Sequence, residues 1–212
     1  MRPSMSESSA TTRTAQVAVI GGGPAGLTAA LALGSAGIKT ALVAKRPEAA
    51  DNRTTALMAS SVAALARLGA WPFCAMHAAP LSAIRIIDAT GRLLRAPEVL
   101  FAAHEIGLDA FGHNIENRHL VAALETALDS APSVTRIDDA ALGVDLGPAR
   151  ATVRLSGGRA LSAELIIGAD GRRSMCRQAA GVATTAFSYP QTAVTLNLRH
   201  TRAHHGISTE FH

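Results

Sequence analysis

The chain has 212 residues, 48% of them apolar, which is enough for one large or two modest globular domains with a sizeable buried core. Its formal net charge of +4 comes from scattered arginines rather than a basic run with aromatics, so we expect no nucleic-acid partner. The two cysteines, Cys74 and Cys176, are far apart in the sequence, which argues against a disulfide framework and a cysteine-rich metal site.

The first part of the chain predicts a βαβ unit. Residues 1–15 are polar and lack the apolar core of a signal peptide, so we expect a disordered tail. Residues 17–20 (VAVI) form the continuous apolar run of a buried parallel strand. Pro24 is suited to open a helix and Gly37 to end it. Residues 39–44 then predict the second strand.

The middle of the chain predicts a helix followed by a hairpin. Apolar residues recur at helical spacing over 55–68. Residues 83–87 and 92–96 flank a turn at 88–91, which is typical of a hairpin. No structure is assigned to 98–112, where the pattern has no clear period.

The second half predicts short strands and two helices. Asn117 is a good N-cap for a helix that runs to Leu128. Four strand-like runs follow, at 134–137, 141–146, 151–156 and 165–167. The last of them is continuously apolar, as expected of a buried strand. A short helix is expected around 174–180, and residues 192–199 alternate like a strand.

Residues 21–26 (GGGPAG) match G-x-G-x-x-G between the first strand and the first helix. Gly21 permits the tight turn, Gly23 lets the backbone approach a pyrophosphate, and Gly26 lets the helix pack close to the strand. The helix N-terminus then directs unpaired N–H groups and a positive dipole end at the phosphates. In its strand–helix–strand context the motif predicts dinucleotide binding.

The acid that normally follows such a motif is missing. It should lie about 20 residues after the glycines and hold the ribose hydroxyls, but Ala44 occupies that place. Either Lys45-Arg46 grips the 2′-phosphate of NADP, or the ligand is FAD and the anchor is lost. Two distant stretches favour FAD: Arg53, expected just before a helix, and Asp170-Gly171, just past a predicted buried strand.

Several motifs in register resemble the single-component FAD-dependent aromatic hydroxylases, of which para-hydroxybenzoate hydroxylase is the best-known member. The resemblance is closest to the ubiquinone-biosynthesis branch and covers nearly all of 16–212. The segments that carry it are VAVIGGGPAGLTAALAL, DNRTTALMASSVAALARLGAW, NIENRHLVAAL, LIIGADGRRSMCRQAAG and YPQTAVTLNL. It implies an α/β fold in which a Rossmann-like FAD-binding domain with a parallel sheet is interleaved with a partial antiparallel-sheet substrate domain.

The order of the expected elements, in which βαβ pieces are interrupted by antiparallel-looking pieces, divides the chain after its tail into two interleaved domains. Residues 16–80 and 113–184 would form the discontinuous FAD-binding domain. Residues 81–112 and 185–212 would be pieces of the substrate domain, incomplete at the C-terminus. We therefore expect the N-terminal part of a longer enzyme.

The resemblance also implies roles for particular residues. The cofactor-binding set is Gly21, Gly23, Ala25, Gly26, Arg53, Arg118, Asp170 and Gly171. The glycine loop would bind the FAD diphosphate, and Arg53 the pyrophosphate and NAD(P)H. Arg118 would make a polar contact with the cofactor, Asp170 would accept from a ribitol hydroxyl, and Gly171 would admit close backbone approach. The alternatives are a helix cap for Asp170 and solvated surface charges for the two arginines.

The implied activity is that of an FAD-dependent monooxygenase. Such an enzyme hydroxylates an aromatic, prenylated phenol-like substrate with NAD(P)H and O₂, in ubiquinone biosynthesis. We expect a cytoplasmic protein, with peripheral association at the inner membrane surface or with a biosynthetic complex left open. A flavin-dependent reductase or halogenase of the same fold, and a truncated noncatalytic FAD-binding module, are the alternatives.

The resemblance has one important departure. The family's later Gly-Asp-Ala-His-like motif has no counterpart here, so we expect the 212-residue chain alone to hold FAD poorly and to be inactive. No catalytic acid or base is assigned, because the flavin supplies the difficult chemistry. His200, His204 and His205 have no nearby cysteine or carboxylate ligand set except Glu210, so no metal site is expected.

Overall fold

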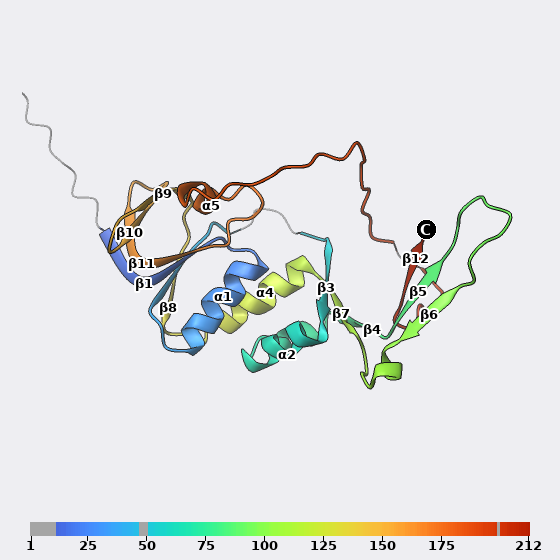
Figure 1. The fold of residues 1–212 in the computed structure, drawn as a ribbon. Coiled ribbons are helices and arrows are strands. Elements are labelled where there is room, and N and C mark those ends of the chain that lie inside the picture. The colour runs from blue at the N-terminus through green and yellow to red at the C-terminus, as the bar shows by residue number, and fades with distance from the viewer. Residues whose placement is uncertain (1–11, 47–50, 199) are drawn as a thin grey trace, which may run out of the picture. The chain divides into compact units, whose positions relative to one another are not determined.

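The computed structural model describes residues 12–46, 51–198 and 200–212 (Figure 1). The chain divides into two compact units, called here the first and the second unit. The first comprises Met1–Glu48 and Ala127–Tyr189, and the second Ala49–Thr126 and Pro190–His212. The domains expected from the sequence instead divide the chain at 80/81, 112/113 and 184/185, and their assignment to cofactor and substrate stays a prediction.

The first unit is built on a six-stranded sheet with the order β8-β2-β1-β11-β10-β9. Its strands are β1 (Thr12–Ile20), β2 (Thr40–Val43), β8 (Val134–Ile137), β9 (Ala141–Leu146), β10 (Ala151–Leu155) and β11 (Ala160–Gly168). The four strands β8, β2, β1 and β11 are parallel to their neighbours, whereas β10 and β9 continue the sheet in antiparallel fashion. This confirms the mixed α/β class with a mostly parallel main sheet.

Strand β1 begins earlier than expected. Residues 12–15, assigned to the disordered tail, pair with β11 in register from Thr12↔Ala160 to Ala15↔Ala163. The pairing with β11 orders these residues although their sequence is polar, because the ladder satisfies backbone groups whatever the side chains are. The remainder of the expected tail lies outside the described residues.

Helix α1 (Pro24–Ser35) connects β1 to β2 and packs on the parallel part of the sheet. A Cβ added at Gly34 would lie only 2.5 Å from Cγ2 of Val134, which shows how closely α1 approaches β8. Val17, Val19 and Leu42 are buried along with α1 residues such as Leu27. Strands covered on both faces are continuously apolar, which explains the VAVI run.

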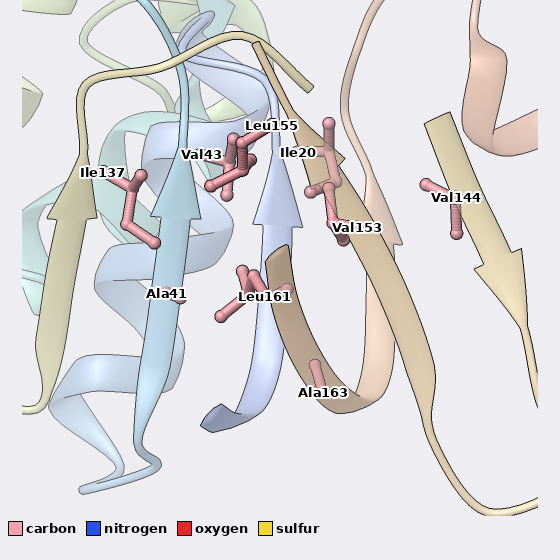
Figure 2. Close-up of a cluster of buried hydrophobic side chains, with 10 residues drawn as sticks. Ile20, Ala41, Val43, Ile137, Val144, Val153, Leu155, Leu161 and Ala163 are labelled. Atoms are coloured by element: carbon pink, nitrogen blue, oxygen red, sulfur yellow. The ribbon is translucent and has the colours of Figure 1, made fainter. Parts of the chain in front are cut away.

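The buried cluster on the sheet gathers alternate residues of several strands (Figure 2). Its members are Ala18, Ile20, Ala41, Val43, Ile137, Val144, Val153, Leu155, Leu161 and Ala163. Met175 and Cys176 of the short helix α5 (Met175–Ala179) pack against it. The two-residue spacing places these side chains on one face of each strand.

The expectation of a buried strand at 165–167 is wrong in part. These residues lie in β11, but Leu165 is 55% exposed and its two successors are only half-buried. Strand β10 pairs with residues 160–163 alone, whereas the later part of β11 pairs on one side only, with β1. The missing neighbour leaves that part of the strand open.

In the part of the chain that the structure describes, the second unit contains two three-stranded sheets, two whole α-helices, most of a third α-helix and one 3₁₀ helix. Its strands are β3 (Thr54–Met58), β4 (Ala78–Leu81), β5 (Ala83–Ile87), β6 (Val99–Ala102), β7 (Gly112–Glu116) and β12 (Ile207–Phe211). The helices are α2 (Ala59–Arg67), α3 (Trp71–Ala75), the 3₁₀ helix η1 (Ala103–Ile106) and α4 (Asn117–Leu128), whose last residues belong to the first unit. One sheet has the antiparallel order β3-β7-β4; in the other, β5 pairs parallel with β12 and antiparallel with β6.

The helix expected over 55–68 starts later, at Ala59. Residues 54–58 instead form β3 and pair with β7. The pairing is close: a Cβ added at Gly112 would lie 2.1 Å from the carbonyl oxygen of Leu57. Tertiary pairing with a distant segment therefore overrides the local helical spacing.

The hairpin exists, but its second strand is β6 rather than residues 92–96. The carboxylate of Asp88 accepts hydrogen bonds from the backbone N–H of Thr90 at 3.0 Å and of Ala96 at 2.9 Å. These bonds order a long connection between β5 and β6, where the sequence had predicted a tight turn. Residues 192–198, expected to form a strand, lie outside any strand, and residue 199 lies outside the described residues.

We predict that Leu161→Ala will lower the free energy of unfolding by about 2–5 kcal/mol, because it leaves a cavity at a side chain only 1% exposed. Leu165→Ala, on the same strand, is the matched control and should cost no more than about 0.5 kcal/mol, as expected at an exposed site. Urea denaturation measures both. Equal losses would contradict the assigned core.

Candidate functional site

Gly21 lies in a backbone conformation that requires glycine. Its φ is +120°, and its N–H donates to the carbonyl oxygen of Val43 at 3.0 Å. An added Cβ would lie 2.2 Å from the carbonyl oxygen of Ala169, just after β11. The turn after β1 is therefore held tightly between β2 and the end of β11.

The other two motif glycines differ in their surroundings. A Cβ at Gly26 would lie 1.9 Å from the carbonyl oxygen of Gly21, so helix α1 packs directly on the turn. A Cβ at Gly23 would meet no atom within 4 Å. Gly26 is thus needed for packing, whereas Gly23 leaves an open stretch of backbone.

The N-terminus of α1 has no side-chain cap. Gly23 is the N-cap residue, Pro24 lies in the first turn, and that turn contains no acidic residue. Ala25 is exposed at the same place. The amide groups and the positive end of the helix dipole are therefore uncompensated by side chains, which is a suitable environment for an anion.

These features fit a dinucleotide diphosphate. Gly21 and Gly26 allow the turn to pack tightly, and Gly23 leaves the backbone open to a ligand because it has no side chain. The N-terminal end of α1 carries the positive end of the helix dipole. The roles of Gly21, Gly23, Ala25 and Gly26 in binding remain predictions.

Asp170 lies next to this loop and is held in place by α5. One carboxylate oxygen accepts from Oγ of Ser174 at 2.6 Å, and the other accepts from the N–H groups of Met175 at 2.6 Å and Cys176 at 3.1 Å. Burial by itself raises the pKa of Asp170, but the bond from Ser174 and those from backbone N–H groups outweigh it, so the pKa is lowered. The helix-cap alternative for Asp170 is present in the structure; the ribitol contact remains a prediction.

The backbone around Asp170 is also constrained. A Cβ added at Gly21 would lie 3.0 Å from the backbone nitrogen of Asp170, which joins the two motifs. Gly171 has φ +83°, and an added Cβ there would meet nothing within 4 Å. Burial, followed by the charge of Asp170, raises the pKa of the Cys176 thiol to about 11, so the thiol is protonated at neutral pH.

Arg53 belongs to the second unit and precedes β3 rather than a helix, which corrects the expectation. Its Nε and Nη2 donate to the two carboxylate oxygens of Asp51 at 2.9 and 2.8 Å. Asp51 also accepts from Nδ2 of Asn117 at 2.9 Å. Hydrogen bonds from Arg53, then from Asn117, hold the pKa of Asp51 well below its usual range.

Arg118 is attached to the same network. Its backbone N–H donates to the carbonyl oxygen of Asp51 at 2.9 Å, and its Nε lies 2.6 Å from Oε2 of Glu116. Each predicted arginine therefore already has a carboxylate partner. Because exposed ion pairs of this kind are weak, an incoming phosphate can compete for either guanidinium.

A groove of about 810 Å³ lies beside Arg53 in the second unit, between residues 52–54 and 194–198. Nδ2 of Asn197 donates to the carbonyl oxygen of Asn52 at 3.1 Å. Neither this groove nor the pairing of Arg53 with Asp51 was predicted from the sequence. The nearest signal was the acid two residues before Arg53, since a short arginine–aspartate spacing permits such a pair.

Ala44, at the place of the missing acid, is buried at the end of β2. A Cβ added at Gly22 would lie 2.7 Å from Cβ of Ala44, so the position faces the glycine loop. Lys45 and Arg46 are exposed. In the described ranges, no three histidine, cysteine or acidic residues are grouped as a metal site would need.

The chain belongs to the FAD-binding monooxygenase family: residues 14–212 match its FAD binding domain. Ubiquinone hydroxylase UbiL of Rhodospirillum rubrum is 33% identical over 207 residues, covering 93% of this chain and 47% of the relative. The 3-demethoxyubiquinol 3-hydroxylase of Escherichia coli is 30% identical over 198 residues, covering 89% and 49%. The chain thus spans about half the length of these curated relatives.

Solved structures of flavin-dependent enzymes share the fold. The p-nitrophenol 4-monooxygenase PnpA from Pseudomonas putida superposes with a TM-score of 0.70 at 23% identity, over 84% of this chain and 46% of that one. The flavin-dependent monooxygenase PieE, solved with FAD and substrate, gives 0.66 at 25% identity, over 80% and 32%. The chain therefore has the fold of FAD-dependent monooxygenases.

We predict that Gly26→Ala will destabilise the chain, because its Cβ would overlap the Gly21 carbonyl. Gly23→Ala should leave the melting temperature nearly unchanged, since its Cβ enters open space at an ordinary φ of −77°. Differential scanning calorimetry measures both variants. A Gly23→Ala variant as unstable as Gly26→Ala would show that the loop is packed differently.

The lowered pKa of Asp170 predicts a pH-dependent contribution to stability. The carboxylate stabilises the fold above its unfolded pKa of about 3.9, and this contribution is lost as the pH falls through the lower folded pKa. Asp170→Asn should therefore destabilise the chain at pH 6, with a difference from wild type that shrinks toward pH 2.5. Urea midpoints measure this, with Asp129→Asn as the exposed control; a pH-independent difference would contradict it.

Proposed function

We propose that the chain provides the FAD-binding part of a monooxygenase that hydroxylates an aromatic ring with NAD(P)H and O₂. The observation that carries this proposal is the glycine loop, in which clamped Gly21 and Gly26 leave Gly23 open at an uncapped helix end. The family membership supports it. The two ubiquinone-hydroxylase relatives favour a prenylated, phenol-like substrate and a place in ubiquinone biosynthesis.

Different residues would bind different parts of the cofactor. The N–H groups at the start of α1 would face the diphosphate, and Gly23 would let the backbone approach it. Asp170 is fixed by α5 and would present its remaining acceptor capacity to the ribitol. When bound, FAD supplies electron transfer from NAD(P)H and the activation of O₂.

The two arginines of the second unit would bind negatively charged groups of the ligands. Arg53 would contact the pyrophosphate or NAD(P)H, and Arg118 would make a further polar contact with the cofactor. Both would exchange part of an existing carboxylate pairing for a phosphate, which accepts two parallel hydrogen bonds from a guanidinium. Their present partners would hold the side chains in defined positions before the ligand arrives.

The substrate suggests where the protein acts. A prenylated phenol partitions into a bilayer, so we propose that the protein is cytoplasmic and works at the inner membrane surface. None of the helices within the described ranges has the length and apolar character needed to cross a membrane.

We predict that Gly23→Ala will weaken FAD binding at least about tenfold, or about 1.4 kcal/mol, because its methyl group occupies the diphosphate approach. Titration of the FAD-free whole protein that carries this chain with FAD, followed by flavin fluorescence, measures the dissociation constant. Gly91→Ala, at another glycine with open space around it, is the control. Unchanged FAD affinity in the Gly23 variant would remove the main support for the proposal.

The reaction itself is tested in the whole protein that carries this chain. NADPH oxidation with O₂ uptake and a hydroxylated aromatic product is the expected result. Oxidation of NADPH without an oxygenated product would instead identify a flavin reductase. A halogenated product, formed when halide is supplied, would identify a halogenase.

A further inference from the structure

The end of β2 lacks the carboxylate that usually holds the adenosine ribose. Ala44 occupies the position and faces Gly22 of the loop, but its methyl group cannot accept a hydrogen bond. A bound dinucleotide would leave its ribose hydroxyls without a side-chain partner from β2. The neighbouring strand β8 ends at the same edge of the sheet.

Asp138, the first residue after β8, lies beside this position. Strands β2 and β8 are parallel, with Val43 opposite Ile137, and the next residues are Ala44 and Asp138. The N–H of Ala44 donates to the carbonyl oxygen of Ile137 at 3.1 Å, which continues the pairing by one step. Asp138 therefore carries a carboxylate at the end of the strand that lies next to β2, where the acid is missing.

The side chain of Asp138 is directed toward the end of β2. Its Oδ1 accepts from the backbone N–H of Arg46 at 3.1 Å. Among the described residues, no donor reaches its second oxygen. One oxygen is therefore anchored, and within the described ranges the other keeps its acceptor capacity for a ligand.

Its neighbour Asp139 is engaged in a different way. Asp139 is buried, and its carboxylate accepts from Oγ of Ser156, from the N–H groups of Ala140 and Gly157, and from Nη2 of Arg159. These bonds, the one from Ser156 first, lower its pKa to about 2. Asp139 stabilises the turn between β8 and β9, whereas Asp138 is exposed and has acceptor capacity to spare.

We propose that Asp138 replaces the missing acid and accepts hydrogen bonds from the hydroxyls of the adenosine ribose of FAD. The proposal rests on the FAD-binding function proposed above. Ribose hydroxyls are donors, and an ionised carboxylate is an acceptor that forms stronger bonds than a neutral group. The same negative charge disfavours a 2′-phosphate, so the site selects an unphosphorylated ribose despite the nearby Lys45 and Arg46.

The test measures binding of ADP, which contains the adenosine half of FAD, to the FAD-free form of the whole protein that carries this chain, by isothermal titration calorimetry. Asp138→Asn preserves an acceptor for the Arg46 N–H but removes the charge, and should weaken ADP binding about tenfold. Asp129→Asn is the exposed control and should bind like wild type. Thermal melting confirms that each variant is folded.

A second ligand identifies the contacted group. Wild type should lose about tenfold in affinity when ADP is replaced by 2′-deoxy-ADP or 3′-deoxy-ADP, and Asp138→Asn should lose much less. Adding Ala44→Glu to the Asp138→Asn variant should restore ADP binding, because it returns a carboxylate to the same edge.

The outcomes separate the two proposals. Equal ADP affinities for wild type and Asp138→Asn overturn the role of Asp138, and so does tighter binding of adenosine 2′,5′-bisphosphate than of ADP, which would assign the site to Lys45 and Arg46. If Gly23→Ala still weakens ADP binding in either case, the proposed FAD function stands. ADP binding that is undetectable in wild type overturns both.

Discussion

The close contact between helix α1 and the turn that precedes it determines the arrangement of the first unit. The ideal Cβ of Gly26 would lie only 1.9 Å from the Gly21 carbonyl oxygen, and that of Gly21 only 2.2 Å from the carbonyl oxygen of Ala169. Strand β1, helix α1 and the end of β11 can therefore meet only because two side chains are absent. This contact directs the uncapped N-terminus of α1 toward the carboxyl edge of the parallel strands, where α/β sheets bind ligands.

The charged groups around the proposed cofactor site are held in position by the protein itself. In the first unit, α5 fixes Asp170 through three hydrogen bonds, and the backbone of Arg46 fixes Asp138 through one. Such prior ordering reduces the entropy that each side chain loses when a ligand binds.

Local sequence patterns worked where neighbours in sequence decide the structure, and failed where distant segments do. The limits of α1 and the short strands β8 and β9 follow from apolar runs and turn residues that lie next to each other. Residues 55–58 lie in the helical pattern but pair with β7, and residues 165–167 carry a buried-strand pattern but lack a neighbour on one side. The contact of Arg53 was likewise predicted without its partner Asp51, whereas the helix cap at Asp170 was among the stated alternatives because α5 follows it directly in the chain.

The sequence by itself determined the glycine loop, the α/β class and the absence of an acid at Ala44, because these depend on residue types at fixed spacing. Only the tertiary structure decided which glycines are clamped and which is open, since that depends on the carbonyl groups of Gly21 and Ala169. It also placed Asp138 beside Ala44. These residues are far apart in the chain, and only the parallel pairing of β2 with β8 makes them neighbours.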